Sequence, residues 1–115
     1  MVLVVLKVIA AALTIVTGLV SLVRPRSVTG FTGLQPAGGR GVTEIRAVLG
    51  GFFIGLGAAP LILSSDAAYQ ALGVGYLVVA LTRAVSMVID RSAVRSNWIS
   101  LAAEIVFGIV LVLPA

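Results

Sequence analysis

The sequence predicts an all-α protein, an antiparallel four-helix transmembrane bundle that occupies residues 1–115 as a single domain. Of its 115 residues, 60% are hydrophobic and only 10% are charged, and the mean hydropathy is +1.21. A soluble domain has about 45–50% apolar and about 25% charged residues. The apolar residues also fall into four blocks, each about as long as the roughly 20 residues that cross a bilayer. Polar residues gather between these blocks.

The predicted spans are residues 2–23, 42–63, 67–89 and 97–113. The first ends at residues 24–26, Arg-Pro-Arg, where two cations and a proline stop the helix. The glycine-rich composition of residues 27–41 indicates a loop, and Thr43 is the expected N-cap of the second span. Residues 64–66, Ser-Ser-Asp, form the expected turn before the third span, and residues 90–96 are the polar connection to the fourth.

The first apolar block has a second interpretation, a secretory signal that would be cleaved. Such a signal has a basic start, a short apolar run and a cleavage site between small residues. Here Lys7 lies inside a long apolar run, so we expect a retained helix. We expect Lys7 to extend its ammonium group to the outer interface, near Asp66, Tyr69 and Gln70, rather than to bind a substrate.

The loop cations predict the orientation of the chain. Five arginines lie between spans one and two or between spans three and four, and none lies in the opposite connection: Arg24, Arg26, Arg40, Arg91 and Arg95. Positive loops face the cytoplasm, so both termini should lie outside it. The net charge of +4 then reflects this loop bias, and we expect no nucleic-acid partner.

Ionisable residues in the spans form the candidate site. Arg83 lies roughly 9 Å from the cytoplasmic end of span three, and Glu104 lies at a similar depth on span four, so these two should pair. The predicted charge cluster consists of Glu44, Arg46, Arg83, Asp90 and Glu104. It has two interpretations. It is either an ion-paired network that fixes helix register, or a polar pocket for a ligand headgroup or a transported ion. Glu44 and Arg46 are two residues apart and face different sides of a helix, so we expect their partners on other helices.

Small residues indicate where the second span packs. They recur every four residues at Ala47, Gly51, Gly55 and Ala59. A stripe of this kind allows close approach of helices within a membrane. We expect it to make helix contacts inside the bundle.

Several chemistries are absent from the sequence. It contains no cysteine and no histidine, which excludes disulfides, thiolate metal sites and any Ser-His-Asp triad. The glycines at residues 38–41 and 50–51 do not fit a phosphate-binding loop or a dinucleotide-binding fingerprint. We therefore expect no enzyme activity, no metal and no cofactor.

The segment Glu44-Ile45-Arg46-Ala47-Val48-Leu49-Gly50-Gly51 carries an E-x-R-A-x-x-G-G pattern. The chain resembles a widespread bacterial family of small four-helix membrane proteins of unknown function that open their second helix with this pattern. That family also has an arginine late in helix three, matched by Arg83 with Asp90, and an acid in helix four, matched by Glu104. It is distantly similar to DoxX-type proteins, some of which accompany oxidoreductase systems. The resemblance implies an accessory role in the bacterial inner membrane.

The sequence leaves three hypotheses for function. The first is a non-enzymatic accessory or assembly subunit of a larger membrane complex, with a lipid-like ligand near the charge cluster. The second is a small homo-oligomeric, proton-coupled transporter that uses Glu104. Its length and span count are similar to those of small multidrug-resistance exporters, but the first span here has Lys7 and lacks their glutamate. The third is a membrane enzyme acting on a lipid or quinone. It has the least support, because the sequence contains no histidine or cysteine and each carboxylate has an arginine as its expected neighbour.

Overall fold

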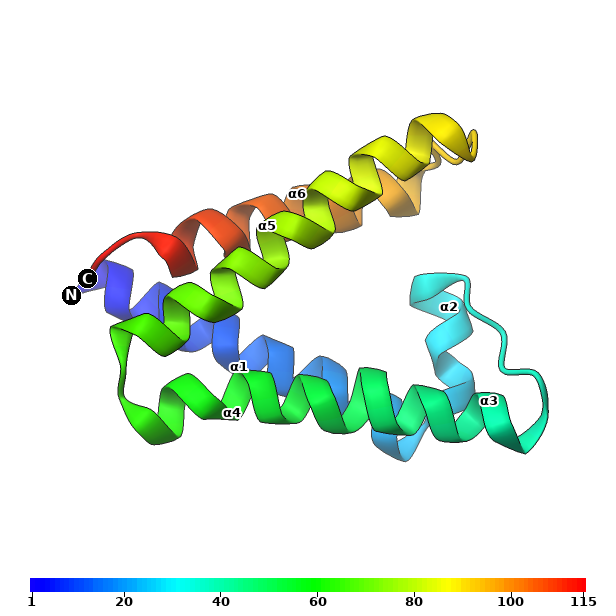
Figure 1. The fold of residues 1–115 in the computed structure, drawn as a ribbon, viewed down its shortest axis with the longest axis horizontal. Coiled ribbons are helices and arrows are strands. Elements are labelled where there is room, and N and C mark those ends of the chain that lie inside the picture. The colour runs from blue at the N-terminus through cyan, green and yellow to red at the C-terminus, as the bar shows by residue number, and fades with distance from the viewer. The chain divides into compact units, whose positions relative to one another are not determined.

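The structure, a computed structural model, describes residues 1–115 and contains helices and no strands (Figure 1). The predicted all-α class is therefore confirmed. Four helices are long and apolar enough to cross a membrane: Val2–Val23, Gly38–Leu63, Asp66–Ile89 and Arg95–Val112. The chain forms two compact units. We call residues 9–63 the central unit, and residues 1–8 with 64–115 the terminal unit.

The central unit pairs α1 (Val2–Val23) with a second long helix. That helix is continuous from Gly38 to Leu63 and comprises α3 (Gly38–Glu44), the π-helix η2 (Ile45–Phe52) and α4 (Phe53–Leu63). The two helices run antiparallel, because Gly50 lies beside Gly18 and Gly57 beside Ala11. A Cβ atom at Gly18 or Gly57 would lie 2.7 Å from a carbonyl oxygen of the opposite helix. Glycine is therefore needed at both contacts.

The packing face of the second long helix differs from the predicted stripe. A Cβ at Gly55 would have no atom within 4 Å, and one at Gly51 would meet only the carbonyl oxygen of Arg46 in its own helix, at 3.8 Å. Ala47 is exposed and Ala59 is half-buried. Because a π-helix bonds residues five apart, η2 changes which residues share a face, and a constant spacing of four does not apply through it.

The connection after α1 contains more helix than the sequence predicted. A short 3-10 helix, η1 (Pro25–Ser27), leads into α2 (Val28–Thr32), which ends at Gly33 in the left-handed region with φ 76°. Helix α3 then begins at Gly38, within the segment predicted as loop, with Ala37 at its N-cap position and no side-chain cap. Thr43, the predicted N-cap, therefore lies inside the helix.

The terminal unit is an antiparallel pair of α5 (Asp66–Ile89) and α6 (Arg95–Val112), which lie side by side in Figure 1. The predicted turn before α5 is present, and the Ser65 side chain caps this helix by accepting from the Ala68 backbone N–H. The two helices meet closely at Gly73 and Gly108, where an added Cβ would lie 2.7 Å and 2.5 Å from side-chain atoms of the other helix. These contacts align the polar residues nearer the connection between α5 and α6.

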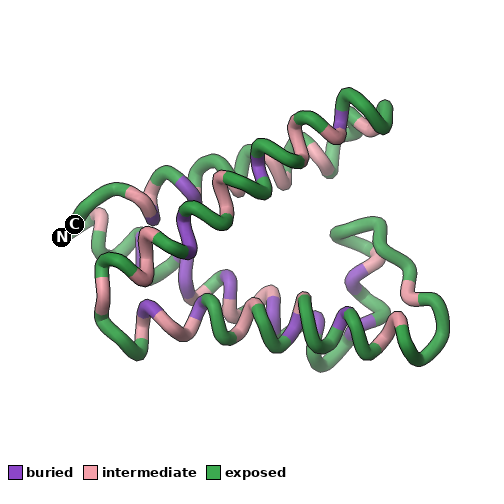
Figure 2. Tube along the Cα trace, viewed as in Figure 1, coloured by how far each residue is buried: buried purple, intermediate pink, exposed green.

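The long helices leave most of their surface uncovered, as the predominantly exposed trace in Figure 2 shows. Only 11% to 28% of the residues in each apolar segment are buried. Soluble monomers rarely expose continuous apolar surface on this scale. Inside a bilayer, lipid would cover such a surface without a free-energy penalty.

Candidate functional site

The centre of the candidate site is an ion pair between α5 and α6. Arg83 Nε donates to Glu104 Oε1 at 2.8 Å, and Arg83 Nη2 donates to Glu104 Oε2 at 2.7 Å. The Glu104 side chain is only 13% exposed. A bidentate arginine–carboxylate pair is stronger and more directional than a single hydrogen bond. Both oxygens of Glu104 are therefore engaged by one guanidinium group.

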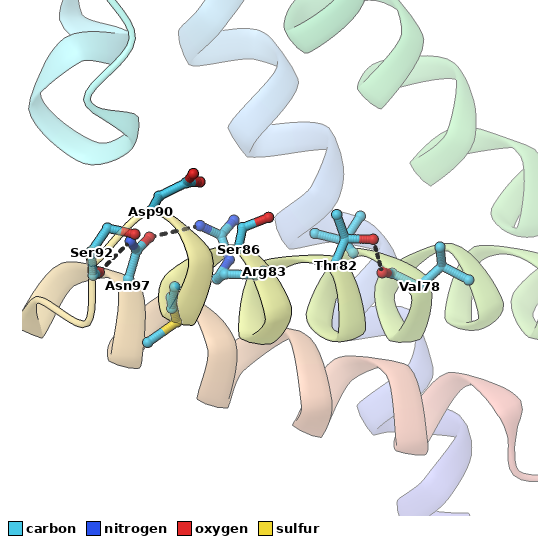
Figure 3. Close-up of a pocket in the computed structure, with 9 residues that line it drawn as sticks. Val78, Thr82, Arg83, Ser86, Asp90, Ser92 and Asn97 are labelled. Atoms are coloured by element: carbon cyan, nitrogen blue, oxygen red, sulfur yellow. Dashed lines mark hydrogen bonds between the residues drawn. The ribbon is translucent and has the colours of Figure 1, made fainter.

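Asn97 extends this pair toward the connection between the two helices. Its Oδ1 accepts from Arg83 Nη1 at 3.0 Å, and its Nδ2 donates to the Ser92 carbonyl oxygen at 2.8 Å (Figure 3). Asn97 was not among the predicted site residues. The signal that could have found it is its position seven residues before Glu104, which places both side chains on one face of α6. Asn97 therefore binds the one guanidinium nitrogen, Nη1, that does not donate to Glu104.

A groove of about 400 Å³ lies along α5 beside this network. It is lined by Val78, Val79, Thr82, Arg83, Ser86, Met87, Asp90, Ser92 and Asn97. Figure 3 shows Asp90 at one end, Val78 at the other and Arg83 between them. The groove is therefore polar at the C-terminal end of α5 and apolar toward the middle of that helix.

The carboxylate of Asp90 has no ion-pair partner, in contrast to the other three acids of the chain, which pair with Lys7, Arg40 and Arg83. Asp90 is exposed at the end of α5, and its backbone N–H donates to the Ser86 carbonyl oxygen at 2.7 Å. Its negative charge is thus available to a molecule that enters the groove.

Glu44 and Arg46 belong to the central unit and take no part in the groove. Glu44 pairs with Arg40, four residues earlier on the same helix, and both side chains are exposed. The expectation that Glu44 needs a partner on another helix was wrong, because α3 begins early enough to include Arg40. Arg46 is exposed on η2. Of the predicted charge cluster, the structure brings together Arg83 and Glu104, with Asp90 in the adjoining groove.

Lys7 forms a second polar site at the opposite end of the terminal unit. Its side chain is 1% exposed, so the expected extension to the interface does not occur. Lys7 Nζ donates to Asp66 Oδ1 at 3.0 Å and to the Leu111 carbonyl oxygen at 3.2 Å, and it lies 5.9 Å from the Tyr69 ring centroid. The last carbonyls of a helix lack partners within it. Lys7 therefore supplies a side-chain cap for the end of α6.

The groove presents several groups that can bind a polar molecule. No three His, Cys, Asp or Glu side chains lie close enough together to hold a metal ion. Both carboxylate oxygens of the half-buried Glu104 accept hydrogen bonds from Arg83. What the groove offers a ligand is a guanidinium edge, two serine hydroxyls, one unpaired carboxylate and an apolar end.

A family model described as a domain of unknown function (DUF4345) matches residues 2–114. No curated protein and no solved structure gives a significant match.

Proposed function

Because the chain belongs to the DUF4345 family of unknown function, we propose its role from its own geometry. It is a non-enzymatic integral membrane protein and an accessory or assembly subunit of a larger membrane complex. It holds a lipid-like ligand in the groove beside Arg83. The similarity to DoxX-type proteins stays a prediction and agrees with an accessory role.

One observation carries the membrane assignment. Four helices of 18 to 26 residues are apolar along their lengths and leave most of their residues exposed. Helices of this length match a hydrocarbon core of about 30 Å. The charged pair Arg83–Glu104, which would be costly in lipid if it were unpaired, is satisfied internally. The proposed arrangement is an antiparallel bundle in the bacterial inner membrane.

The loop charges support one orientation for that bundle. The arginine-bearing connections lie after α1 and after α5, and the intervening connection after α4, residues 64–65, carries no cation. By the bias of positive loops toward the cytoplasm, both termini lie outside the cytoplasm. The groove end at Asp90 then lies at the cytoplasmic surface.

The transporter hypothesis has weaker support. A proton-coupled carrier needs a carboxylate that gains and loses its proton during the cycle. Both oxygens of Glu104 accept hydrogen bonds from Arg83, so neither oxygen is left unengaged. The geometry therefore favours a structural role for Glu104 and a binding role for the groove.

The test begins with native membranes that contain the tagged protein. After an alkaline carbonate wash, we expect the protein to stay in the membrane pellet, because spanning helices resist this treatment. Native mass spectrometry after gentle detergent extraction should then show a complex of defined stoichiometry with other subunits. A protein released by the wash would contradict the membrane assignment. A bare homo-oligomer would contradict the accessory role.

A further inference from the structure

The groove residues follow a fixed order along α5. Asp90 follows the C-terminal end of α5, Arg83 lies seven residues earlier on that helix, and Val79 and Val78 lie earlier still. Figure 3 shows Asp90 and Arg83 toward one end of the groove and Val78 at the other. With a rise of 1.5 Å per residue, Val78 is about 18 Å from Asp90 along the helix axis. That distance is comparable to one leaflet, roughly half of a hydrocarbon core of about 30 Å.

We propose that this groove binds a phospholipid whose headgroup ends in a primary ammonium group. The inference rests on the proposed function, because it requires α5 to span the membrane. The ammonium group contacts Asp90, the phosphate contacts Arg83, and an acyl chain continues over Val79 and Val78. In such a lipid the ammonium, phosphate and acyl chain follow one another in the same order as these groove residues.

The charge of the groove favours an ammonium headgroup over an anionic one. Glu104 neutralises Arg83 through two hydrogen bonds, so the unpaired Asp90 leaves this region with a net negative charge. The nearest basic residues in sequence, Arg91 and Arg95, are exposed and do not line the groove. A headgroup with only negative charge would be repelled by Asp90, whereas an ammonium group would be attracted.

The hydrogen-bonding groups of the groove also match the phosphate and the ammonium group of this headgroup. A guanidinium has five N–H donors, and Arg83 uses three of them on Glu104 and Asn97. The other two, with the hydroxyls of Ser86 and Ser92 in the lining, can donate to phosphate oxygens. The Asp90 carboxylate only accepts, which suits the N–H donors of a primary ammonium. A choline headgroup has none.

The size of the groove fits a headgroup rather than a whole lipid. Its volume of about 400 Å³ lies at the lower end of the roughly 300–1,000 Å³ found for small-molecule pockets. It accommodates the polar part and the upper carbons of one chain, while the remaining chain stays in the bilayer.

The test measures lipid binding to the purified full chain in detergent micelles by native mass spectrometry. The probes are phosphatidylethanolamine, phosphatidylcholine and phosphatidylglycerol with identical acyl chains. We expect phosphatidylethanolamine to bind about tenfold more tightly than the other two, because a hydrogen bond between charged groups contributes about that factor or more. Asp90→Asn should remove this preference. Glu44→Gln, which removes an exposed carboxylate of the central unit, is the charge-matched control and should keep it.

Equal binding of the three lipids to the wild-type chain would overturn the proposal. So would a preference that survives Asp90→Asn or disappears in Glu44→Gln. If Asp90→Asn does not fold, Val79→Trp replaces it. The larger side chain fills the apolar end and should weaken phosphatidylethanolamine binding, so unchanged binding would overturn the proposal. The carbonate wash separates the two claims: a protein that stays in the membrane but shows no lipid preference refutes only this inference.

Discussion

Substitution of Gly73 by alanine tests the contact between α5 and α6. A Cβ at Gly73 would lie 2.7 Å from Leu111 Cβ and 2.9 Å from the Val112 backbone nitrogen. These atoms belong to or adjoin the backbone of α6, so they cannot rotate away. Restoring an ordinary distance of at least 3.4 Å requires the helices to separate locally by about 0.7 Å. The substitution therefore strains the contact between α5 and α6 at this position.

The expected change in the free energy of unfolding follows from two opposing effects. Replacing glycine by alanine inside a helix contributes up to about 1 kcal/mol of stability. Overpacking a tight contact costs about 1–3 kcal/mol. At Gly75, two residues further along α5, an added Cβ would have no atom within 4 Å. Gly75→Ala therefore gains helix stability without a steric cost. We expect Gly73→Ala to be less stable than Gly75→Ala by about 1–3 kcal/mol.

The assay is reversible unfolding of both variants in mixed micelles with increasing sodium dodecyl sulfate. Circular dichroism reports helix loss, and the fluorescence of Trp98, the single tryptophan of the chain, reports the environment of α6. Equal unfolding midpoints for Gly73→Ala and Gly75→Ala would show that α5 and α6 do not meet at this glycine. That result would refute the packing that aligns Arg83 with Glu104.

Three further predictions use the same unfolding assay. Gly57→Ala should be less stable than Gly55→Ala by about 1–3 kcal/mol, because only Gly57 lies against α1. If Gly55→Ala were the less stable variant, the result would favour the small-residue stripe predicted from the sequence. Lys7→Met should lower the free energy of unfolding by about 1–3 kcal/mol, since it leaves the Asp66 carboxylate and the Leu111 carbonyl without their donor. A variant as stable as the wild type would contradict the stabilising role of these two hydrogen bonds. Arg83→Met and Glu104→Gln should each lower the free energy of unfolding by about 3–5 kcal/mol, while the double variant should lose much less than the sum of the two. Additive losses would show that Arg83 and Glu104 do not stabilise each other.

The long helices could be predicted from the sequence because each is an uninterrupted apolar segment. Their ends were harder to predict. Residues 38–41 are rich in glycine, a poor helix former, yet α3 includes them. The exposed pair of Arg40 with Glu44 lies within this helix and favours it through their spacing of four residues. A left-handed glycine such as Gly33 is a common helix end, and this residue was the local signal for the short α2.

The candidate site was predicted in part for a similar reason. Depth along two spans depends only on residue number, so the matching depths of Arg83 and Glu104 follow from the sequence alone. The position of Lys7 near Asp66 and Tyr69 was expected from the sequence and is present. Its contact with the Leu111 carbonyl oxygen at the end of α6 joins two segments far apart in sequence, and no local pattern predicts it. The π-helix η2 has no periodicity that distinguishes it beforehand, so the spacing of small residues around Gly51 was misleading.

The central claim, that α5 crosses the membrane with its Asp90 end in the cytoplasm, has a direct test. Because the chain contains no cysteine, single-cysteine variants are clean reporters. Ala67→Cys and Ala93→Cys replace exposed alanines beside opposite ends of α5. In intact cells, a membrane-impermeant maleimide should label Ala67→Cys at once and Ala93→Cys only after permeabilisation. Labelling of both variants in intact cells, or of neither until permeabilisation, would contradict a membrane-spanning α5, and the opposite pattern would invert its orientation.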